Sequence, residues 1–372
     1  MLRRGKPTLQ RLLPQARQLA STADEFSKLE HEMWQRGAKA YDATFAKVTT
    51  QATNALLDAA GVHRKREAMK SIVDSVNPAR IPSLFEAAVP TPPNERKPVE
   101  PSPQLFRVLD VATGPGSLAA VAAERGADEV VGVDISSEML ALAKPITDTH
   151  PGVSFMQGDA AALPVADASF DAVIIAFGLL HLPSPQSAIA EAFRVLKPGG
   201  RLSFSVWDEP SRALGFGVVL NAIAAHGDPN VKLPAGPDGK LPLSFFHFAS
   251  ADNSTAALAS AGFEGVTVER VPCRAGLPHE DALYDMFASA TARTRATLEL
   301  QTEEQRTAIR AAMAAELRDK FSGVWIDGRV RAPSFTHAVP GSDQKLSDGR
   351  PTGRNAVMVP MDAVVVSANK PL

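Results

Sequence analysis

Apolar side chains recur every three or four positions from Asp24 to about Ala60, which predicts an amphipathic helical region near the N-terminus. The recurring residues are Phe26, Leu29, Met33, Tyr41, Phe45, Val48, Ala52 and Leu56. A basic stretch from His63 to Arg66 follows, and after it a proline-rich span that ends at Pro103. Because proline interrupts helices and central strands, we expect residues 63–104 to form an irregular linker or a surface insertion.

The pattern changes at Phe106, where short β-branched runs begin to alternate with helical segments. The predicted strands are Phe106–Val111, Glu129–Val133, Val153–Met156, Phe170–Ala176 and Arg201–Trp207. The predicted helices between them cover residues 117–125, 137–144 and 185–196. This alternation predicts right-handed βαβ units and an α/β fold with a doubly wound, mostly parallel sheet. The strands are nearly continuous apolar runs, as expected when helices cover both faces of the sheet.

The pattern is less regular after Trp207. A turn at Lys197–Gly200 is expected before the fifth strand, and loops are expected at Lys232–Phe248 and at the polar, Gly- and Pro-rich residues 327–355. The remaining predicted elements are a helix at Ala213–Ala225, a helix at Ser254–Ala261, a strand near Val266–Cys273, two amphipathic helices within residues 280–322 and a closing strand at Val357–Ser367.

Composition and charge exclude only a few classes of partner and binding site. The 372 residues include 45% hydrophobic residues, 39 Lys and Arg, and 41 Asp and Glu, so the near-neutral chain gives no reason to expect a nucleic acid or an anionic membrane as partner. The longest apolar run, Ala172–Leu182, is much shorter than a membrane span. The single cysteine, Cys273, fits a reducing compartment and excludes a zinc site built from several cysteines, and no metal is expected.

The N-terminal segment, residues 1–23, is basic and contains no acidic residue. Its leucines fall at helical spacing, which is typical of a mitochondrial transit peptide. Pro7 and Pro14 interrupt that pattern and favour a solvated, frayed helix instead. A cytoplasmic location is therefore the main expectation, with mitochondrial import as the alternative.

Three predicted strands end at or near an aspartate: Asp110, Asp134 and Asp159. In an open parallel sheet, ligands bind just outside the carboxyl ends of the strands, so the three carboxylates are expected to line one crevice. Gly114 and Gly116 follow the first strand and allow the backbone to approach a ligand closely. An aspartate at the end of the second strand can accept hydrogen bonds from both hydroxyls of a ribose.

Asp110 distinguishes between a dinucleotide and a ligand that carries a positive charge. In a dinucleotide site the pyrophosphate would lie at this turn, and a carboxylate there would repel it. A ligand with a cationic ammonium would be attracted. S-adenosylmethionine has a ribose, an adenine, an α-ammonium and a sulfonium but no phosphate, and Asp159 is a plausible acceptor for its adenine amino group.

Five motifs in this region resemble those of the class I S-adenosylmethionine-dependent methyltransferases, in order and at the expected distances. They are Val108–Gly116, Val131–Asp134, Gly158–Ala160, Phe170–Val173 and Arg194–Gly200. The resemblance is strongest to small-molecule enzymes of the ubiquinone and menaquinone type, and it covers residues 105–272 firmly and 30–62 and 280–322 more loosely. It implies a seven-stranded Rossmann-like domain over residues 105–372, with a helical lid at 24–62 and a helical insertion at 280–322.

The resemblance also implies a set of residues that bind S-adenosylmethionine. Asp110, Ala112, Gly114 and Gly116 would hold the methionine part, and Asp134 would bind the ribose. The residues expected around the adenine and beside the cofactor are Ile135, Met139, Gly158, Asp159, Ala160 and Phe177. Asp134 and Asp159 could instead cap the helices that follow them, and Met139 and Phe177 could be ordinary core residues.

Methyl transfer from a sulfonium is an in-line displacement that needs a general base only when the nucleophile arrives protonated. His181, just past the fourth strand, is the candidate base, with His247 as a weaker one; either could serve only in packing. The residues expected to roof the acceptor are Trp34, Tyr41, Phe45, Phe245, Phe246, His247, Met286 and Phe287. Such a lid favours a small hydrophobic acceptor, such as a quinone, phenol, polyketide or terpenoid, with O- or C-methylation.

Two other functions fit the sequence less well. Gly114-Pro-Gly116-Ser-Leu-Ala119 also matches the glycine-rich turn of an NAD(P)-dependent oxidoreductase, although Asp110 argues against that interpretation. A non-catalytic S-adenosylmethionine-binding partner protein could use the insertions at 63–104 and 327–355 as contact surfaces. The sequence indicates neither the oligomeric state nor the acceptor.

Overall fold

Seven strands form the central sheet of the protein, which we describe from a computed structural model covering residues 13–63, 105–234, 243–321, 325–326, 329–330 and 357–372. The spatial order of the strands is β3-β2-β1-β4-β5-β11-β6. They are β1 (Arg107–Val111), β2 (Glu129–Asp134), β3 (Val153–Gln157), β4 (Phe170–Ala176), β5 (Leu196–Trp207), β6 (Glu264–Val271) and β11 (Ala363–Asn369). Two short pairs stand apart: β7 (Arg274–Leu277) with β10 (Val357–Pro360), and β8 (Trp325–Ile326) with β9 (Arg329–Val330).

All neighbouring strands from β3 to β5 run parallel, and only β11 runs against its neighbours. Leu109 lies opposite Val131 of β2 and Val173 of β4 in the parallel part. Val365 of β11 lies opposite Ser205 of β5 and Glu269 of β6 in antiparallel register. The predicted doubly wound, mostly parallel seven-stranded α/β fold is therefore confirmed.

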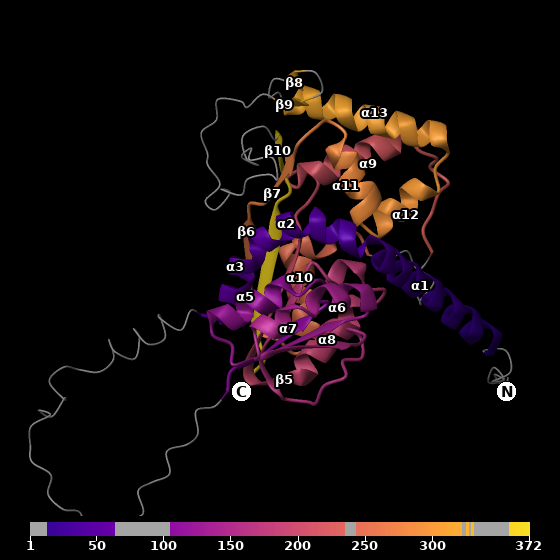
Figure 1. The fold of residues 1–372 in the computed structure, drawn as a ribbon. Helices are drawn as coiled ribbons and strands as arrows, with labels where there is room; N and C mark the ends of the chain where they lie inside the picture. The colour runs from indigo at the N-terminus through magenta and orange to yellow at the C-terminus, as the bar shows by residue number, and fades with distance from the viewer. Residues whose placement is uncertain (1–12, 64–104, 235–242, 322–324, 327–328, 331–356) are drawn as a thin grey trace, which may run out of the picture.

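The helices lie on both faces of the sheet and at one end of it. They are α1 (Leu13–Ala43), α2 (Ala46–Thr49), α3 (Thr53–Ala59), α5 (Ser117–Arg125), α6 (Ser137–Ala143), α7 (Ile146–Thr149), α8 (Pro185–Val195), α9 (Leu214–His226), α10 (Ala251–Ser260), α11 (Ala282–Ala290), α12 (Arg293–Glu299) and α13 (Glu303–Lys320), with short 3-10 turns η2 (Thr50–Ala52), η4 (Leu179–His181) and η5 (His247–Ala249). Figure 1 shows the long helix α1 running between the sheet with its flanking helices and a second group formed by α9, α11, α12 and α13.

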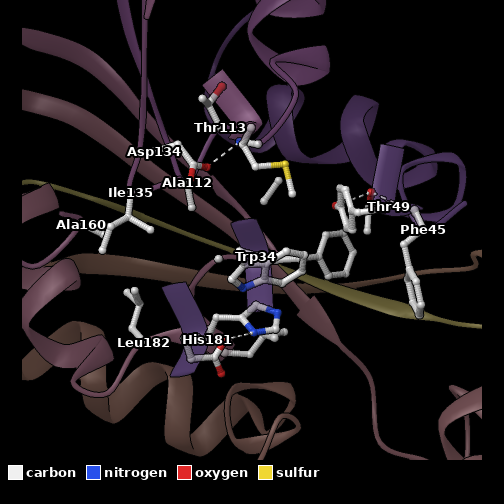
Figure 2. Close-up of a pocket in the computed structure, with 18 of the residues that line it drawn as sticks. Trp34, Phe45, Thr49, Ala112, Thr113, Asp134, Ile135, Ala160, His181 and Leu182 are labelled. Atoms are coloured by element: carbon white, nitrogen blue, oxygen red, sulfur yellow. Dashed lines mark hydrogen bonds and ion pairs between the residues drawn. The ribbon is translucent and has the colours of Figure 1, made fainter. Parts of the chain in front are cut away.

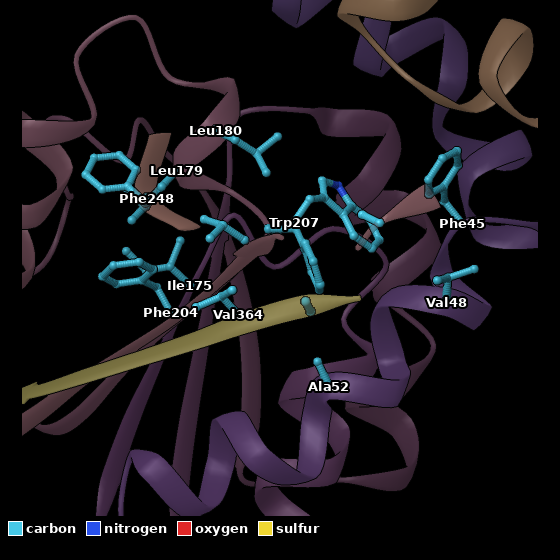
Figure 3. Close-up of a cluster of buried hydrophobic side chains, with 14 of the residues drawn as sticks. Phe45, Val48, Ala52, Ile175, Leu179, Leu180, Phe204, Trp207, Phe248 and Val364 are labelled. Carbon is cyan, nitrogen blue, oxygen red and sulfur yellow. The ribbon is translucent and has the colours of Figure 1, made fainter. Parts of the chain in front are cut away.

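The core alternates along each strand because successive side chains point to opposite faces of the sheet. Val108 and Leu109 thus belong to different apolar clusters. The cluster around Val108 is closed by α3 and α5, and the one around Leu109 by α8 and by the helices beyond β5. In Figure 3, Phe45, Val48 and Ala52 line up on the N-terminal helices beside Trp207 and Val364. The N-terminal helices are therefore part of the core, not an appended tail.

Three boundaries differ from the expectations. The N-terminal helix begins at Leu13 rather than near Asp24, since Pro14 lies in its first turn, where proline is tolerated. The expected turn at Lys197–Gly200 is wrong, because β5 already pairs with β4 at Leu196; a register shift and the positive φ of Gly199 accommodate it. The expectation of one closing strand at Val357–Ser367 is also wrong, since this segment forms two strands, β10 and β11, which belong to different sheets.

Several expectations fall largely outside the described residues. These are the basic start up to residue 12, the linker from residue 64 to 104 and nearly all of the loop 327–355, of which only Arg329–Val330 is described, as β9. Of the described helices, none combines the length and the apolar character that a membrane span needs.

Candidate active site

A large pocket lies between the carboxyl ends of β1, β2 and β4 and the helix α1. In Figure 2, Ala112, Thr113 and Asp134 lie on one side of this pocket, and Trp34 and His181 lie on another. The pocket holds about 1670 Å³ of space not filled by protein atoms, open solvent at its mouth included. Its lining extends from Asp134 at the end of β2 to Tyr41 on α1 and His181 in η4.

The turn after β1 has the left-handed backbone that its glycines permit. Gly114 and Gly116 have φ values of 56° and 80°, and Ala112 adopts φ 56° despite its side chain. Gly114 lines the pocket, whereas Gly116 does not. Gly116 precedes α5, and a Cβ there would lie 2.8 Å from side-chain atoms of Ile146 and Phe155. Close packing as well as the turn therefore requires a glycine at 116.

Asp110 is fully buried in the wall of the pocket, and one of its two oxygens lacks a partner. The Thr113 hydroxyl donates to Oδ2 at 2.7 Å, while Oδ1 accepts no hydrogen bond from the described residues. Burial raises the pKa of the Asp110 carboxyl to about 7; the nearby Asp134 carboxylate also raises it, and the Thr113 hydrogen bond and a weaker interaction with the Ala119 backbone amide lower it. A buried orphan oxygen of this kind needs a donor, and a cationic donor would favour its ionised form.

Asp134, at the end of β2, is held by two backbone amides. Gly114 N donates to Oδ2 and Ser136 N donates to Oδ1, both at 2.8 Å. Burial raises the pKa of Asp134, although these amides and the nearby His31 oppose the shift. The residue that caps α6 is Ser136, whose hydroxyl accepts from Met139 N, so Asp134 is not the helix cap. Each carboxylate oxygen of Asp134 keeps a further lone pair for a ligand.

The remaining residues expected around an adenine surround the same part of the pocket. Ile135, Met139, Gly158, Asp159 and Ala160 all line it. The Ile135 side chain is 41% exposed and Met139 is buried. Asp159 is exposed, and its Oδ1 accepts from Ala161 N at 2.8 Å. An exposed isoleucine at the mouth of a pocket offers an apolar surface against which a flat ring could pack.

Phe177 lies just past β4 in a strained conformation. Its φ is 53°, and its amide donates to Ser205 O at 3.0 Å. Its ring packs on Trp207 with centroids 4.3 Å apart, and both rings line the pocket. The strain therefore turns an aromatic side chain toward the pocket at the end of the strand.

His181, the expected base, also lines the pocket, and it belongs to a buried chain of charges. Its Nδ1 lies 3.2 Å from Glu30 Oε2, and Glu30 Oε1 accepts from Arg293 Nε at 2.7 Å. Burial raises the pKa of Glu30, but the charges and hydrogen bonds of His181 and Arg293 together outweigh it and leave that pKa lowered. Glu30 was not expected from the sequence. The signal that could have indicated it is an acidic residue on the apolar face of α1, between Phe26 and Met33.

The expected acceptor-binding residues divide into two groups. Trp34, Tyr41, Phe45 and Phe245 line the pocket. Phe246, His247, Met286 and Phe287 do not line it, and Phe287 is instead buried against Phe45 and Phe216. His247 lies 3.4 Å from the Asn253 side chain, away from the lining. The pocket wall also includes residues that the sequence did not indicate: Glu30, His31, Thr49, Trp207, Phe216 and Thr294.

Part of the chain that lines this pocket is similar to known methyltransferases. Residues 109–204 match the model of the family described as "Methyltransferase domain". A demethylmenaquinone methyltransferase of Thermus thermophilus is 39% identical over 163 residues, which are 42% of this chain and 74% of that protein. The chain belongs to the class I S-adenosylmethionine-dependent methyltransferases.

Other relatives match over shorter stretches. A demethylmenaquinone methyltransferase of Renibacterium salmoninarum is 47% identical over 105 residues, and the match spans 43% of its length. A ubiquinone/menaquinone biosynthesis C-methyltransferase of Methylobacterium nodulans is 46% identical over 112 residues, or 44% of its length. The methyltransferase thus spans less than half of these two relatives.

The pocket chemistry suits the methyl donor of this family. The orphan oxygen of Asp110, the backbone-held Asp134 and the exposed Ile135 offer a partner for a cation, an acceptor for hydroxyls and an apolar platform. A pyrophosphate would face buried carboxylates there, so the oxidoreductase alternative is not favoured. The expectation of S-adenosylmethionine as cofactor is confirmed by the family.

Proposed function

We propose that this methyltransferase transfers a methyl group from S-adenosylmethionine to a ring carbon of a small hydroxylated aromatic acceptor of the quinol type. The observation that carries the proposal is His181, backed by the Glu30 carboxylate, in a pocket wall otherwise rich in aromatic rings. The names of the relatives, which refer to demethylmenaquinone and to C-methylation, support a quinol and a carbon atom.

The cofactor half of the pocket would hold S-adenosylmethionine. It is defined here as the lining residues from β1 and β2, from the turns after β1, β2 and β3, and from α6, together with Phe177. Asp110 Oδ1 would accept from the α-ammonium, and Asp134 from the ribose hydroxyls. Ala112 and Gly114 would leave room for the methionine part. The residues proposed to surround the adenine or flank the cofactor are Ile135, Met139, Gly158, Asp159, Ala160 and Phe177.

The acceptor half would hold the aromatic ring. It is defined here as the lining residues from α1, α2, η4 and α12, together with Phe45 and Phe245. His181 Nε2 would accept the proton of the acceptor hydroxyl, which raises electron density at the ring carbon beside it. When bound, S-adenosylmethionine supplies an electrophilic methyl group on a sulfonium that leaves with the electron pair of its carbon–sulfur bond. The new carbon–carbon bond forms, the methylated ring carbon loses its hydrogen as a proton, and His181 returns its proton to the ring oxygen. One proton is released overall.

Incubation with methyl-labelled S-adenosylmethionine and 2-prenyl-1,4-naphthoquinol, kept reduced with dithionite, tests the proposal. We expect one labelled methyl group in the product by mass analysis. A C-methylated product still oxidises to a quinone, whereas an O-methylated product does not, so oxidation in air distinguishes the two. The oxidised quinone is the control and should not react, because it has no hydroxyl proton.

Two outcomes would contradict this proposal. Labelled product that resists oxidation would show methylation at oxygen. Absence of methylation on every quinol and phenol tried, with cofactor bound, would favour the non-catalytic binding protein instead.

A further inference from the structure

A buried chain of three charged or polar side chains ends at the wall of the acceptor half. It runs from Arg293 on α12 through Glu30 on α1 to His181 in η4. The side chains of Glu30 and Arg293 are 7% and 8% exposed, and that of His181 is 16% exposed. Three segments that are far apart in the sequence therefore contribute to one hydrogen-bonded unit beside the pocket.

From this geometry we infer that Glu30 is a positioning residue, which fixes the His181 imidazole in the tautomer that leaves Nε2 as a free proton acceptor facing the acceptor half. The inference rests on the proposed function, because it assigns a purpose to the orientation of a proposed base. Neither the family match nor the names of the relatives point to Glu30 or Arg293.

The hydrogen-bond inventory decides which ring nitrogen carries the proton. An ionised carboxylate can only accept, and the guanidinium of Arg293 already donates to Oε1. The remaining oxygen, Oε2, faces His181 Nδ1 at 3.2 Å, so Nδ1 must be the donor. In a neutral imidazole the other nitrogen, Nε2, is then the acceptor.

Aromatic rings hold both ends of the chain in place. Trp34 and Phe245 contact the His181 ring with centroids at 4.8 and 5.4 Å. The Arg293 guanidinium lies 4.8 Å from the ring centroids of Phe26 and Phe245, and its Nη1 donates to Leu243 O. Neither partner of Glu30 can therefore turn away from it without breaking these contacts.

An ion pair that only joined α1 to α12 would need Glu30 and Arg293 alone. The Glu30 carboxylate also forms a hydrogen bond with His181, which lines the pocket. An ion pair that served only to hold the two helices together would not require that hydrogen bond. Other titratable groups near this part of the pocket are His31 on α1, which interacts with Asp134, and His247 in η5, which contacts Asn253. Neither has a hydrogen bond to His181 among the described residues.

The test compares the wild-type chain with Glu30→Gln, His181→Asn and a matched control, Glu32→Gln. Glu32 lies on the same helix with its side chain 66% exposed and paired only loosely with Arg36. In Glu30→Gln the side-chain oxygen can still accept from Arg293, but the amide then donates to His181 Nδ1 and forces the proton onto Nε2.

Ring ¹⁵N NMR of histidine-labelled protein reads the tautomer directly, with the His181 signal assigned by its loss in His181→Asn. We expect the proton on Nδ1 in the wild type and in Glu32→Gln, and on Nε2 in Glu30→Gln. With 2-prenyl-1,4-naphthoquinol, kcat should fall about 10²- to 10⁴-fold in Glu30→Gln, as when an orienting carboxylate or a general base is lost. The KM for the quinol and the Kd for S-adenosylhomocysteine should stay within about 3-fold, as expected if Glu30 acts through His181 and not by binding either ligand.

The inference is overturned if the wild type carries the His181 proton on Nε2, or if Glu30→Gln keeps wild-type kcat. It is also overturned if Glu30→Gln raises KM and the cofactor Kd as much as it lowers kcat, because that pattern indicates a general loss of structure. The NMR measurement needs no acceptor and no variant of Glu30. Failure of the wild type to methylate any quinol would therefore overturn the proposed function and leave the tautomer to decide this inference.

Discussion

The cofactor half and the acceptor half of the pocket are built in different ways. In the cofactor half, Asp134 is held by the amides of Gly114 and Ser136, which are 20 and 2 residues away along the chain. In the acceptor half, Glu30 reaches His181 and Arg293 across 151 and 263 residues. The first site follows from the ends of adjacent strands, and the second depends on how the helices pack over the sheet.

This difference separates the two tasks of a methyltransferase. The sheet offers a rigid, preformed edge for the donor, which is common to many acceptors. In the proposed function, the helices that cover it supply side chains that meet the acceptor, among them Trp34 and Tyr41 of α1. Gln35 of α1 joins the two parts, since its Oε1 accepts from the Ser136 hydroxyl and from Glu138 N at the start of α6.

The largest effect confined to the cofactor half is expected for Asp134→Ala. Loss of its charge-assisted hydrogen bonds should weaken cofactor binding by about 1–3 kcal/mol. Isothermal titration with S-adenosylhomocysteine measures this effect, and Asp148→Ala, on the exposed helix α7, is the control. An unchanged dissociation constant would remove Asp134 from the cofactor site.

The next effect is a pH dependence of cofactor binding that originates at Asp110. Its pKa of about 7 means that the carboxyl is protonated below that pH and cannot pair with an ammonium. The cofactor affinity should therefore rise with pH, about tenfold per unit well below pH 7, and level off above it. Titrations between pH 5.5 and 7.5 measure the slope. Asp110→Asn keeps the shape of the side chain and should remove the dependence of cofactor affinity on pH. If the slope persists in this variant, another group causes the pH dependence.

The smallest effect is expected for Ile135→Ala. Ile135 is 41% exposed, so truncation of its side chain should barely change the free energy of unfolding. If the adenine packs against Ile135, the truncation should weaken cofactor binding by about 1 kcal/mol. Leu220→Ala, equally exposed but on α9 outside the pocket, is the matched control for both measurements. Equal cofactor affinity in the two variants would place the adenine elsewhere.

Sequence reasoning predicted the fold, and it predicted which residues at the strand ends lie together in one part of the pocket, because both are encoded locally. Alternating strands and helices predict the parallel sheet, and acidic residues at strand ends predict where its ligand binds. Gly116 shows the limit of this reasoning: its place beside Gly114 suggested a ligand contact, whereas it does not line the pocket and packs closely against Ile146 and Phe155.

The acceptor half could be predicted only in part. Apolar periodicity indicates that Phe45 and Phe287 are buried, but it does not show which of them borders a cavity and which packs against another helix. Phe287 fills the core behind Phe45, and His247 contacts α10. Glu30 was missed because its two partners lie in distant segments, and only the packing of α1 brings them together.

The most direct test of the division between the two halves is a double-mutant cycle of Asp134→Ala and His181→Asn. Asp134 and His181 share no hydrogen-bond partner among the described residues, so their effects should add within about 0.5 kcal/mol. The cycle combines the Kd for S-adenosylhomocysteine with single-turnover methylation of 2-prenyl-1,4-naphthoquinol at saturating cofactor. We expect Asp134→Ala to raise the Kd by the same factor in both backgrounds, and His181→Asn to slow methylation about 10²- to 10⁴-fold in both. A coupling energy above about 1 kcal/mol in either measurement would contradict the account.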